Sequence, residues 1–114
     1  MEDCIFCRIV SGQIPSSKVY ETDRVLAFDD IHPMAPVHVI VVPKMHIATL
    51  MDVAPERIHD IGALMTGVQE VARIKGMDQD GFRTVINCNS DGGQIIFHLH
   101  IHVLGGVKLR DELN

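Results

Sequence analysis

The chain has 114 residues, which is the size of one ordinary domain and leaves no room for a separate cofactor-binding domain. Hydrophobic residues make up 46% of it and charged residues 22%, a composition that is typical of a globular protein and excludes general disorder. The net charge is -5 at pH 7. This charge excludes the basic surface that binding to duplex nucleic acid requires.

The sequence contains no segment that suggests a membrane or secretory location. No apolar run reaches the length of a membrane span, and the first ten residues do not form a secretory signal. We therefore expect a single cytoplasmic domain over residues 1–114, with no membrane partner. Because disulfides are disfavoured in a reducing compartment, Cys4 and Cys7, in a C-x-x-C spacing, need another role.

The predicted elements alternate between helices and strands along the chain. Two helices are predicted, a short one at residues 4–10 that stops at Ser11-Gly12 and a long one at residues 55–75. Apolar and β-branched runs predict four strands, at residues 25–28, 37–42, 82–88 and 95–104. Proline-rich residues 30–36 are expected to form a loop, and Pro15 an extended connection. This order indicates an α+β domain with a mainly antiparallel sheet.

The candidate chemistry is concentrated in the last predicted strand, where His98, His100 and His102 alternate with apolar residues. Successive side chains of a strand point to opposite faces, so the three histidines should share one face. Phe97, Leu99, Ile101 and Val103 should pack on the other. A solvated strand face is the least favoured interpretation, because histidine is scarce at such positions.

Two chemical interpretations of this histidine row remain. Residues four apart in a strand are separated by roughly 14 Å, so the outer pair cannot converge on one metal ion, although one or two of the three could be ligands. Alternatively, imidazoles can act as nucleophile, proton donor and phosphate ligand. The glycine turn Ser90 to Gln94, directly upstream, has backbone N–H groups that could point at an anion.

At these residues the sequence resembles the histidine triad (HIT) family, in its nucleotide-binding (Hint) branch. The resemblance covers nearly the whole chain, through Ile14-Pro15-Ser16, residues 26–31, residues 33–38, Val42-Pro43-Lys44, and residues 91–94 running into residues 98–106. Gly105-Gly106 favours this branch over the dinucleoside polyphosphate hydrolases. The resemblance implies a five-stranded antiparallel sheet with a short N-terminal helix and one long helix. It also implies a homodimer whose sheets continue across the interface, with the long helices packed together.

The resemblance further implies a purine nucleoside monophosphate site of the AMP or GMP type, with no organic cofactor. His100 matches the nucleophile, His102 the residue that contacts the phosphate and leaving group, and His38 a supporting histidine. Asp30 matches the carboxylate that receives both ribose hydroxyls. The other matching positions form the base and sugar pocket (Ile5, Phe6, Ile9, Phe28, Ile31, Ile40) and the phosphate end (Asn87, Gly93, Ile95, Ile96).

Some bacterial members of the family bind zinc through a C-x-x-C pair, a downstream histidine and the first histidine of the triad. Cys4, Cys7, His46 and His98 match this set and would form a closed Cys2His2 site, in which zinc is structural. The alternative is two cysteines packed on the buried face of a short helix.

We therefore expect a purine nucleoside phosphoramidate or acyl-nucleotide hydrolase that acts through a nucleotidyl-His100 intermediate. The alternative is a purine-nucleotide-binding regulatory or partner-binding protein with incidental hydrolysis. One departure from the family lies at Ile95, where close relatives usually have Ser or Thr. Isoleucine keeps the backbone N–H but has no side-chain donor for the phosphoryl group.

Overall fold

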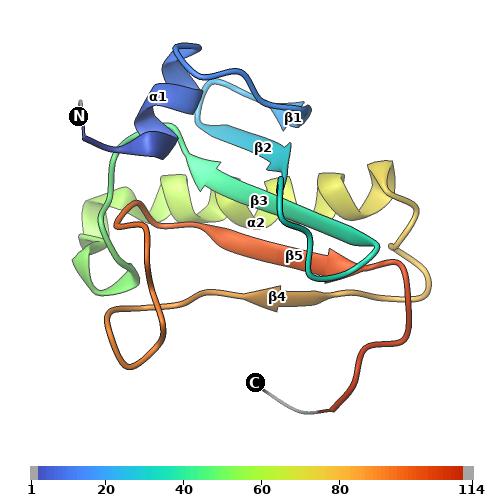
Figure 1. Cartoon of the computed structure of the whole chain (residues 1–114). Coiled ribbons are helices and arrows are strands. Elements are labelled where there is room, and N and C mark those ends of the chain that lie inside the picture. The colour runs from blue at the N-terminus through green and yellow to red at the C-terminus, as the bar shows by residue number, and fades with distance from the viewer. Residues whose placement is uncertain (1–2, 112–114) are drawn as a thin grey trace.

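The computed structural model describes residues 3–111, which form one antiparallel β-sheet with a helix on each face (Figure 1). The helices are α1 (Ile5–Ser11) and α2 (Ile58–Ile74), and the strands are β1 (Lys18–Glu21), β2 (Val25–Asp29), β3 (Val37–Pro43), β4 (Arg83–Val85) and β5 (Ile101–Gly105). Two short 3₁₀ turns, Leu50–Asp52 and Pro55–Arg57, lead into α2. The predicted α+β fold with a five-stranded antiparallel sheet is confirmed.

The strand order is β1-β2-β3-β5-β4, and each neighbouring pair is antiparallel. The sheet brings β5, late in the chain, beside β3, so that His102 lies opposite Ile40 and Leu104 opposite His38. This pairing places histidines from two distant parts of the sequence on neighbouring strands.

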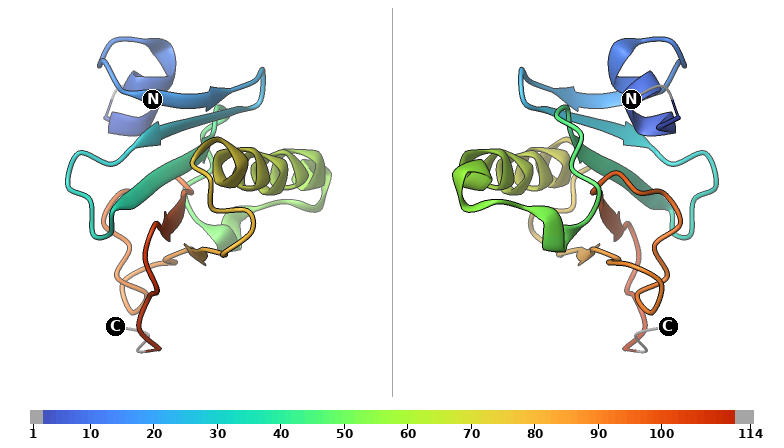
Figure 2. Two further views of the ribbon diagram at one scale, coloured as in Figure 1. Left: turned by 90° about the vertical axis from the view of Figure 1, so that its right-hand side faces the viewer. Right: turned by 90° about the vertical axis from the view of Figure 1, so that its left-hand side faces the viewer.

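Successive side chains of each central strand point to opposite faces of the sheet. Because both faces are covered, the core has two layers. On one face, Val25, Val39, Ile101 and their neighbours pack with Leu64, Val68 and Val71 of α2. On the other face, Leu26, Phe28, Ile40 and Val42 pack with Cys4, Phe6 and Ile9 of the α1 region. Figure 2 shows α2 on one side of the sheet, with the β2–β3 loop on the opposite side.

The last strand is shorter than residues 95–104 predict, since β5 begins only at Ile101. Its pairing with β3 ends at Val41, two residues before Pro43, which has no N–H to donate to a ladder. The backbone before Ile101 bonds elsewhere, with Leu99 N donating to Ile47 O at 2.7 Å. The histidine row therefore spans the junction between an irregular segment and a strand.

Strand β4 is also shorter than the predicted residues 82–88. Val85 pairs with His102, so residues beyond Ile86 would lie opposite positions before the start of β5 and have no ladder there. Strand β1 has no counterpart among the four strands predicted from residue patterns. It is a four-residue edge strand with exposed ends at Lys18 and Glu21, which is too short and too polar for a clear alternation.

The two helices begin one to three residues later than predicted. Cys4 is the N-cap of α1, where its Sγ accepts a hydrogen bond from Cys7 N at 3.3 Å, and Gly12 ends the helix in the left-handed conformation (φ 86°). Pro55 opens a 3₁₀ turn, so α2 itself starts at Ile58. Within residues 3–111, no helix has the length and apolar character needed to cross a membrane.

Candidate functional site

A cavity of about 690 Å³ lies on the α1 side of the sheet, and it collects the residues that the sequence singles out. All fourteen predicted catalytic and substrate-binding residues line it: Ile5, Phe6, Ile9, Phe28, Asp30, Ile31, His38, Ile40, Asn87, Gly93, Ile95, Ile96, His100 and His102. These positions come from six separate stretches of the chain. Their individual roles remain predictions.

One part of this cavity is apolar and buried. Phe6, Ile9, Phe28 and Ile40 are each at most 8% exposed, and the rings of Phe6 and Phe28 meet edge to face with centroids 5.6 Å apart. Such walls suit a flat aromatic base, which they hold by stacking and burial.

His100 stands where this apolar part meets the polar part, and its backbone contact determines which ring nitrogen carries the proton. His100 is 7% exposed, and the ring of Phe6 packs against it with centroids 5.0 Å apart. Its Nδ1 lies 2.7 Å from His98 O, an acceptor only, so Nδ1 must be the donor. In the neutral ring Nε2 is then unprotonated and carries the lone pair that a nucleophile needs.

His38 and His102 form a second pair whose tautomers are determined in the same way. Met34 N donates to His38 Nδ1 at 3.0 Å, so the proton of neutral His38 is on Nε2. That nitrogen lies 2.9 Å from His102 Nδ1 and 3.3 Å from Asp30 Oδ2. With His38 Nε2–H as donor, His102 Nδ1 accepts and Nε2 of His102 carries its proton toward the cavity.

Burial keeps these histidines neutral at physiological pH, because removing a ring from water disfavours its charged form. The pKa of His102 is lowered to about 4, mainly by burial and also by the neighbouring His100 and His38, with partial opposition from Asp30. Burial also lowers the pKa of His100 and of His38, partly opposed by the His98 carbonyl and by Asp30, respectively. The free site therefore presents neutral imidazoles, with opposite tautomers at His100 and His102.

The glycine turn beside the histidines is built differently from the expected anion loop. The N–H groups of Gly93 and Gln94 donate to Ser90 O and Asn89 O, both at 3.0 Å, so neither is directed at an anion. Gly93 adopts a φ of 77°, and a Cβ on Gly92 would lie 2.6 Å from Cys88 O, so both glycines are needed for this turn.

Gln94 has a structural role that residue patterns did not predict. Its buried side chain accepts from Asn89 N at 2.9 Å and donates to Ala48 O at 2.9 Å and Ile96 O at 3.0 Å. The bonds with Asn89 and Ile96 close the turn, and the bond to Ala48 holds it against the segment that follows β3. The walls formed by Gly93 and Ile96 are therefore fixed before any ligand binds.

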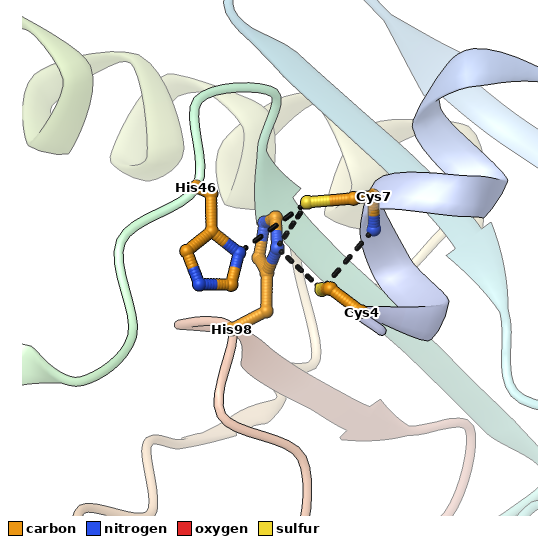
Figure 3. A group of neighbouring side chains, drawn as sticks. All are labelled: Cys4, Cys7, His46 and His98. Carbon is orange, nitrogen blue, oxygen red and sulfur yellow. Dashed lines mark hydrogen bonds between the residues drawn. The ribbon is translucent and has the colours of Figure 1, made fainter. Parts of the chain in front are cut away.

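Beside this cavity, the four predicted metal ligands converge (Figure 3). Cys4 and Cys7 come from the start of α1, His46 follows β3, and His98 precedes β5. Cys4 Sγ lies 3.2 Å from His98 Nδ1, and Cys7 Sγ lies 3.3 Å from His46 Nδ1 and 3.5 Å from His98 Nδ1. One atom from each of the four residues lies within 4.8 Å of the others.

This geometry fits a tetrahedral ion. Zinc bonds of about 2.3 Å to sulfur and about 2.05 Å to nitrogen, at tetrahedral angles, place sulfur and nitrogen about 3.6 Å apart. The three measured distances are within about 0.4 Å of that value. His98 Nε2 lies 2.8 Å from Pro43 O and must donate to it, which leaves Nδ1 as a lone-pair donor toward the thiols. The cysteines are free thiols rather than a disulfide.

Two side chains lie elsewhere than the strand pattern predicts. Phe97 was expected to pack on the α2 face but is 48% exposed, because it belongs to the irregular segment before β5. Strict alternation also places Ile95 opposite His100, yet Ile95 is 88% exposed and lines the same cavity. The cavity also includes Met34, which residue patterns did not identify, because its part in the site is a backbone bond to His38.

Known proteins of similar sequence indicate the family to which the chain belongs. The family model described as "HIT domain" matches residues 11–109. "Purine nucleoside phosphoramidase" of Escherichia coli (strain K12) is 41% identical over 108 residues, covering 95% of this chain and 91% of that protein. "14 kDa zinc-binding protein" of Brassica juncea is 42% identical over 109 residues, covering 94% and 96%.

A solved histidine triad protein from Clostridium difficile superposes on this chain with a TM-score of 0.95. The two sequences are 49% identical, and the match covers 98% of this chain and 97% of that one. Both the family model and these relatives extend over most of the chain, which therefore belongs to the HIT domain family.

Proposed function

We propose that this protein hydrolyses purine nucleoside 5'-phosphoramidates, or the related acyl-nucleotides, by transferring the nucleotidyl group first to His100 and then to water. The observation that carries the proposal is the pair of opposite tautomers, with a lone pair on His100 Nε2 and a proton on His102 Nε2. The phosphoramidase activity in the name of the Escherichia coli relative supports this reaction class.

In this proposal the nucleoside occupies the apolar part of the cavity. The base packs among Phe6, Ile9, Phe28 and Ile40, which are already buried and need little rearrangement. Asp30 accepts the ribose hydroxyls. Its Oδ1 takes one bond from His32 N at 2.8 Å, and a carboxylate retains further lone pairs for a diol.

The first transfer forms a bond between His100 Nε2 and phosphorus and breaks the bond from phosphorus to the leaving nitrogen. The negative phosphoryl group raises the pKa of the adjacent His102 above its value in the free site, so that His102 takes up one proton from solvent when the substrate binds and, as an imidazolium, gives its Nε2 proton to the leaving amine. The amine departs neutral, and His102 is left neutral.

The second transfer reverses these roles. Water attacks phosphorus, the bond to His100 Nε2 breaks, and the ring recovers its lone pair. The proton of the attacking water passes to His102 Nε2, and release of the product returns the additional proton of His102 to solvent, so the enzyme ends as it began and the products are a nucleoside monophosphate and an amine. In the free site His38, held by Met34 N, sets the tautomer in which His102 Nδ1 accepts and Nε2 carries the proton.

We also propose that Cys4, Cys7, His46 and His98 hold one zinc ion, as the donor distances and the name of the Brassica juncea relative support. Four protein ligands leave no open position, so the ion would stabilise the fold and take no part in the reaction. It would link α1 to the segment that carries His100. The reduced thiols that this site needs fit the cytoplasm as the compartment.

A homodimer is the assembly that we infer for this chain. β4 is the last strand in the sheet order, so its outer edge is available for a partner strand among the described elements. Phe82 and Ile86, which flank β4, are 39% and 37% exposed. Sedimentation should give twice the mass of one chain, and a monomer at micromolar concentration would contradict this assembly.

Turnover of adenosine 5'-phosphoramidate tests the proposed function against the binding alternative. We expect release of AMP with catalytic turnover, and loss of that turnover in His100→Ala. Micromolar AMP binding without turnover of the phosphoramidate would instead support a nucleotide-binding regulatory or partner-binding protein.

A further inference from the structure

Three large apolar side chains that line the catalytic cavity are almost fully exposed. Ile31 is 86% exposed, Met34 83% and Ile95 88%, yet all three line the same cavity as His100 and His102. Single exposed apolar residues are ordinary on protein surfaces, whereas three that border one reactive cavity indicate a surface that a ligand covers. The family resemblance assigns Ile31 to the base and sugar pocket, which leaves Met34 and Ile95 to be explained.

The buried position of the nucleophile indicates which part of a substrate lies there. His100 is 7% exposed and its attacking Nε2 is the ring nitrogen turned away from His98 O. In an in-line displacement the leaving group departs on the side of phosphorus opposite the nucleophile. With the nucleoside held in the buried apolar part, the leaving group projects toward the exposed mouth.

We propose that Met34 and Ile95 form an apolar subsite for the leaving group, so that the preferred substrates are nucleoside phosphoramidates or acyl-nucleotides with an uncharged, apolar leaving group. This inference rests on the proposed function and specifies its substrate class. Met34 N also bonds His38, so its side chain starts beside the pair formed by His38 and His102.

A neighbouring cavity provides room for a long leaving group. It has a volume of about 530 Å³, shares Ile5, Ile95 and Ile96 with the catalytic cavity, and continues to the half-exposed Phe97. Asp3, Cys4 and His46 also line this cavity, so an aliphatic chain that passes Ile95 would pack against its apolar residues Ile5, Ile96 and Phe97.

The charged groups around the mouth do not favour a charged leaving group. No Lys or Arg is among the described residues that line the catalytic cavity. Of its two carboxylates, Asp29 forms an ion pair with Lys75 at 3.0 Å, and Asp30 accepts from His32 N and faces His38.

The test is a series of adenosine 5'-phosphoramidates whose leaving amines are methylamine, propylamine and pentylamine, which have similar basicity. Amines of similar length that end in a hydroxyl or an ammonium group provide the polar and charged comparisons. Full burial of a methylene is worth about fourfold in kcat/KM, and an open mouth should give about half of that free energy, roughly twofold. The pentyl compound has four more methylenes than the methyl compound, so we expect kcat/KM to rise about fifteenfold between them.

Two variants locate the preference. Met34→Gln and Ile95→Ser should each reduce the pentyl-to-methyl ratio at least threefold, since each replaces an apolar wall with a polar one. Met51→Gln is the matched control, because Met51 is 77% exposed but lies in the 3₁₀ turn Leu50–Asp52 and lines neither cavity. Its ratio should equal that of the unmodified chain.

The outcomes separate the inference from the proposed function. A pentyl-to-methyl ratio near one, better turnover of the hydroxyl- or ammonium-ended amines, or an unchanged ratio in both mouth variants would overturn the apolar subsite while leaving the hydrolase intact. Failure to hydrolyse any phosphoramidate, including the unsubstituted one, would overturn the proposed function, and the subsite with it.

Discussion

Replacing Cys4 by serine should separate the contribution of zinc from that of the helix cap. Cys4 is 8% exposed, caps α1 through its Sγ, and lies 3.2 Å from His98 Nδ1. Serine is itself a favourable N-cap, so Cys4→Ser preserves the cap while removing one of the four proposed zinc ligands. The variant should therefore lose stability mainly through loss of the metal.

The expected fall in Tm follows from the stability that the ion contributes and from the length of the chain, which sets the entropy of unfolding. Structural zinc is worth far more than about 3 kcal/mol in domains that are unfolded without it. Here the core layer that packs on α2 contains no proposed zinc ligand, and Cys4 is the one proposed ligand among the buried residues of the other layer, so we take a loss of about 3 kcal/mol as the scale. At about 2.1 cal/mol/K of unfolding entropy per residue, 114 residues give about 240 cal/mol/K. A loss of about 3 kcal/mol then lowers Tm by roughly 12 °C.

The assay is thermal unfolding with and without a chelator, together with elemental analysis of protein purified without chelator. We expect about one zinc per chain, a chelator-induced fall in Tm for the unmodified protein, and no further fall for Cys4→Ser. The rate constant for turnover should change less than stability, because no catalytic step passes through the ion.

Cys88→Ser is the control, since Cys88 is a half-buried free cysteine outside the ligand cluster. It should retain zinc and the chelator response. Absence of zinc under conditions that load a control zinc protein, or equal chelator responses in Cys4→Ser and the unmodified chain, would refute the reasoning.

Three further predictions concern the catalytic cavity. His100→Ala should bind AMP but lose nearly all turnover; a residual rate above about a tenth of the original, a cost of only ~1.4 kcal/mol in barrier, would require another nucleophile. Ile95→Ser should raise kcat/KM for unsubstituted adenosine 5'-phosphoramidate severalfold with little change in AMP affinity. The serine hydroxyl supplies a hydrogen bond worth about 0.5 to 1.5 kcal/mol to a neutral partner. An unchanged or lower kcat/KM in a folded variant would show that the hydroxyl does not reach the phosphoryl group. Unfolding free energy should fall as pH drops from 6.5 toward 4, because unfolded His102 takes up a proton near pH 6.5 and folded His102 only near its pKa of about 4. Urea unfolding should show that the loss of stability between pH 6.5 and 5 is smaller in His102→Gln than in the unmodified protein, by up to roughly 2 kcal/mol. His38 and His100, whose pKa values are also lowered, contribute a loss in both proteins. Equal slopes for the two proteins would contradict a lowered pKa of His102.

Much of the site can be predicted from the pattern of residue types at neighbouring positions in the sequence. The alternation of histidines with apolar residues correctly predicts that Leu99, Ile101 and Val103 pack toward α2 while His98, His100 and His102 lie on the other face. His100 and His102 line the cavity there, whereas His98 joins Cys4, Cys7 and His46. The C-x-x-C spacing places Cys4 and Cys7 one helical turn apart at the start of α1. These features depend on near neighbours in the chain, which a pattern can describe.

The remaining features depend on contacts between distant segments. Pro43 ends the ladder with β5 and accepts from His98, and neither role is visible in the histidine run itself. Gln94 holds its turn through Ala48, 46 residues away in sequence. Met34 acts through its backbone N–H, which every residue except proline has, so no residue type could have identified it.

The central claim is that His100 is transiently nucleotidylated. Mass spectrometry of a reaction that is rapidly quenched without acid tests this claim most directly. Adenosine 5'-phosphoramidate mixed with the protein and quenched within the first turnover should give a chain carrying one adenylyl group, and peptide mapping should place that group on His100. Turnover with no adenylylated chain at any quench time, or an adenylyl group on another residue, would contradict the proposed mechanism.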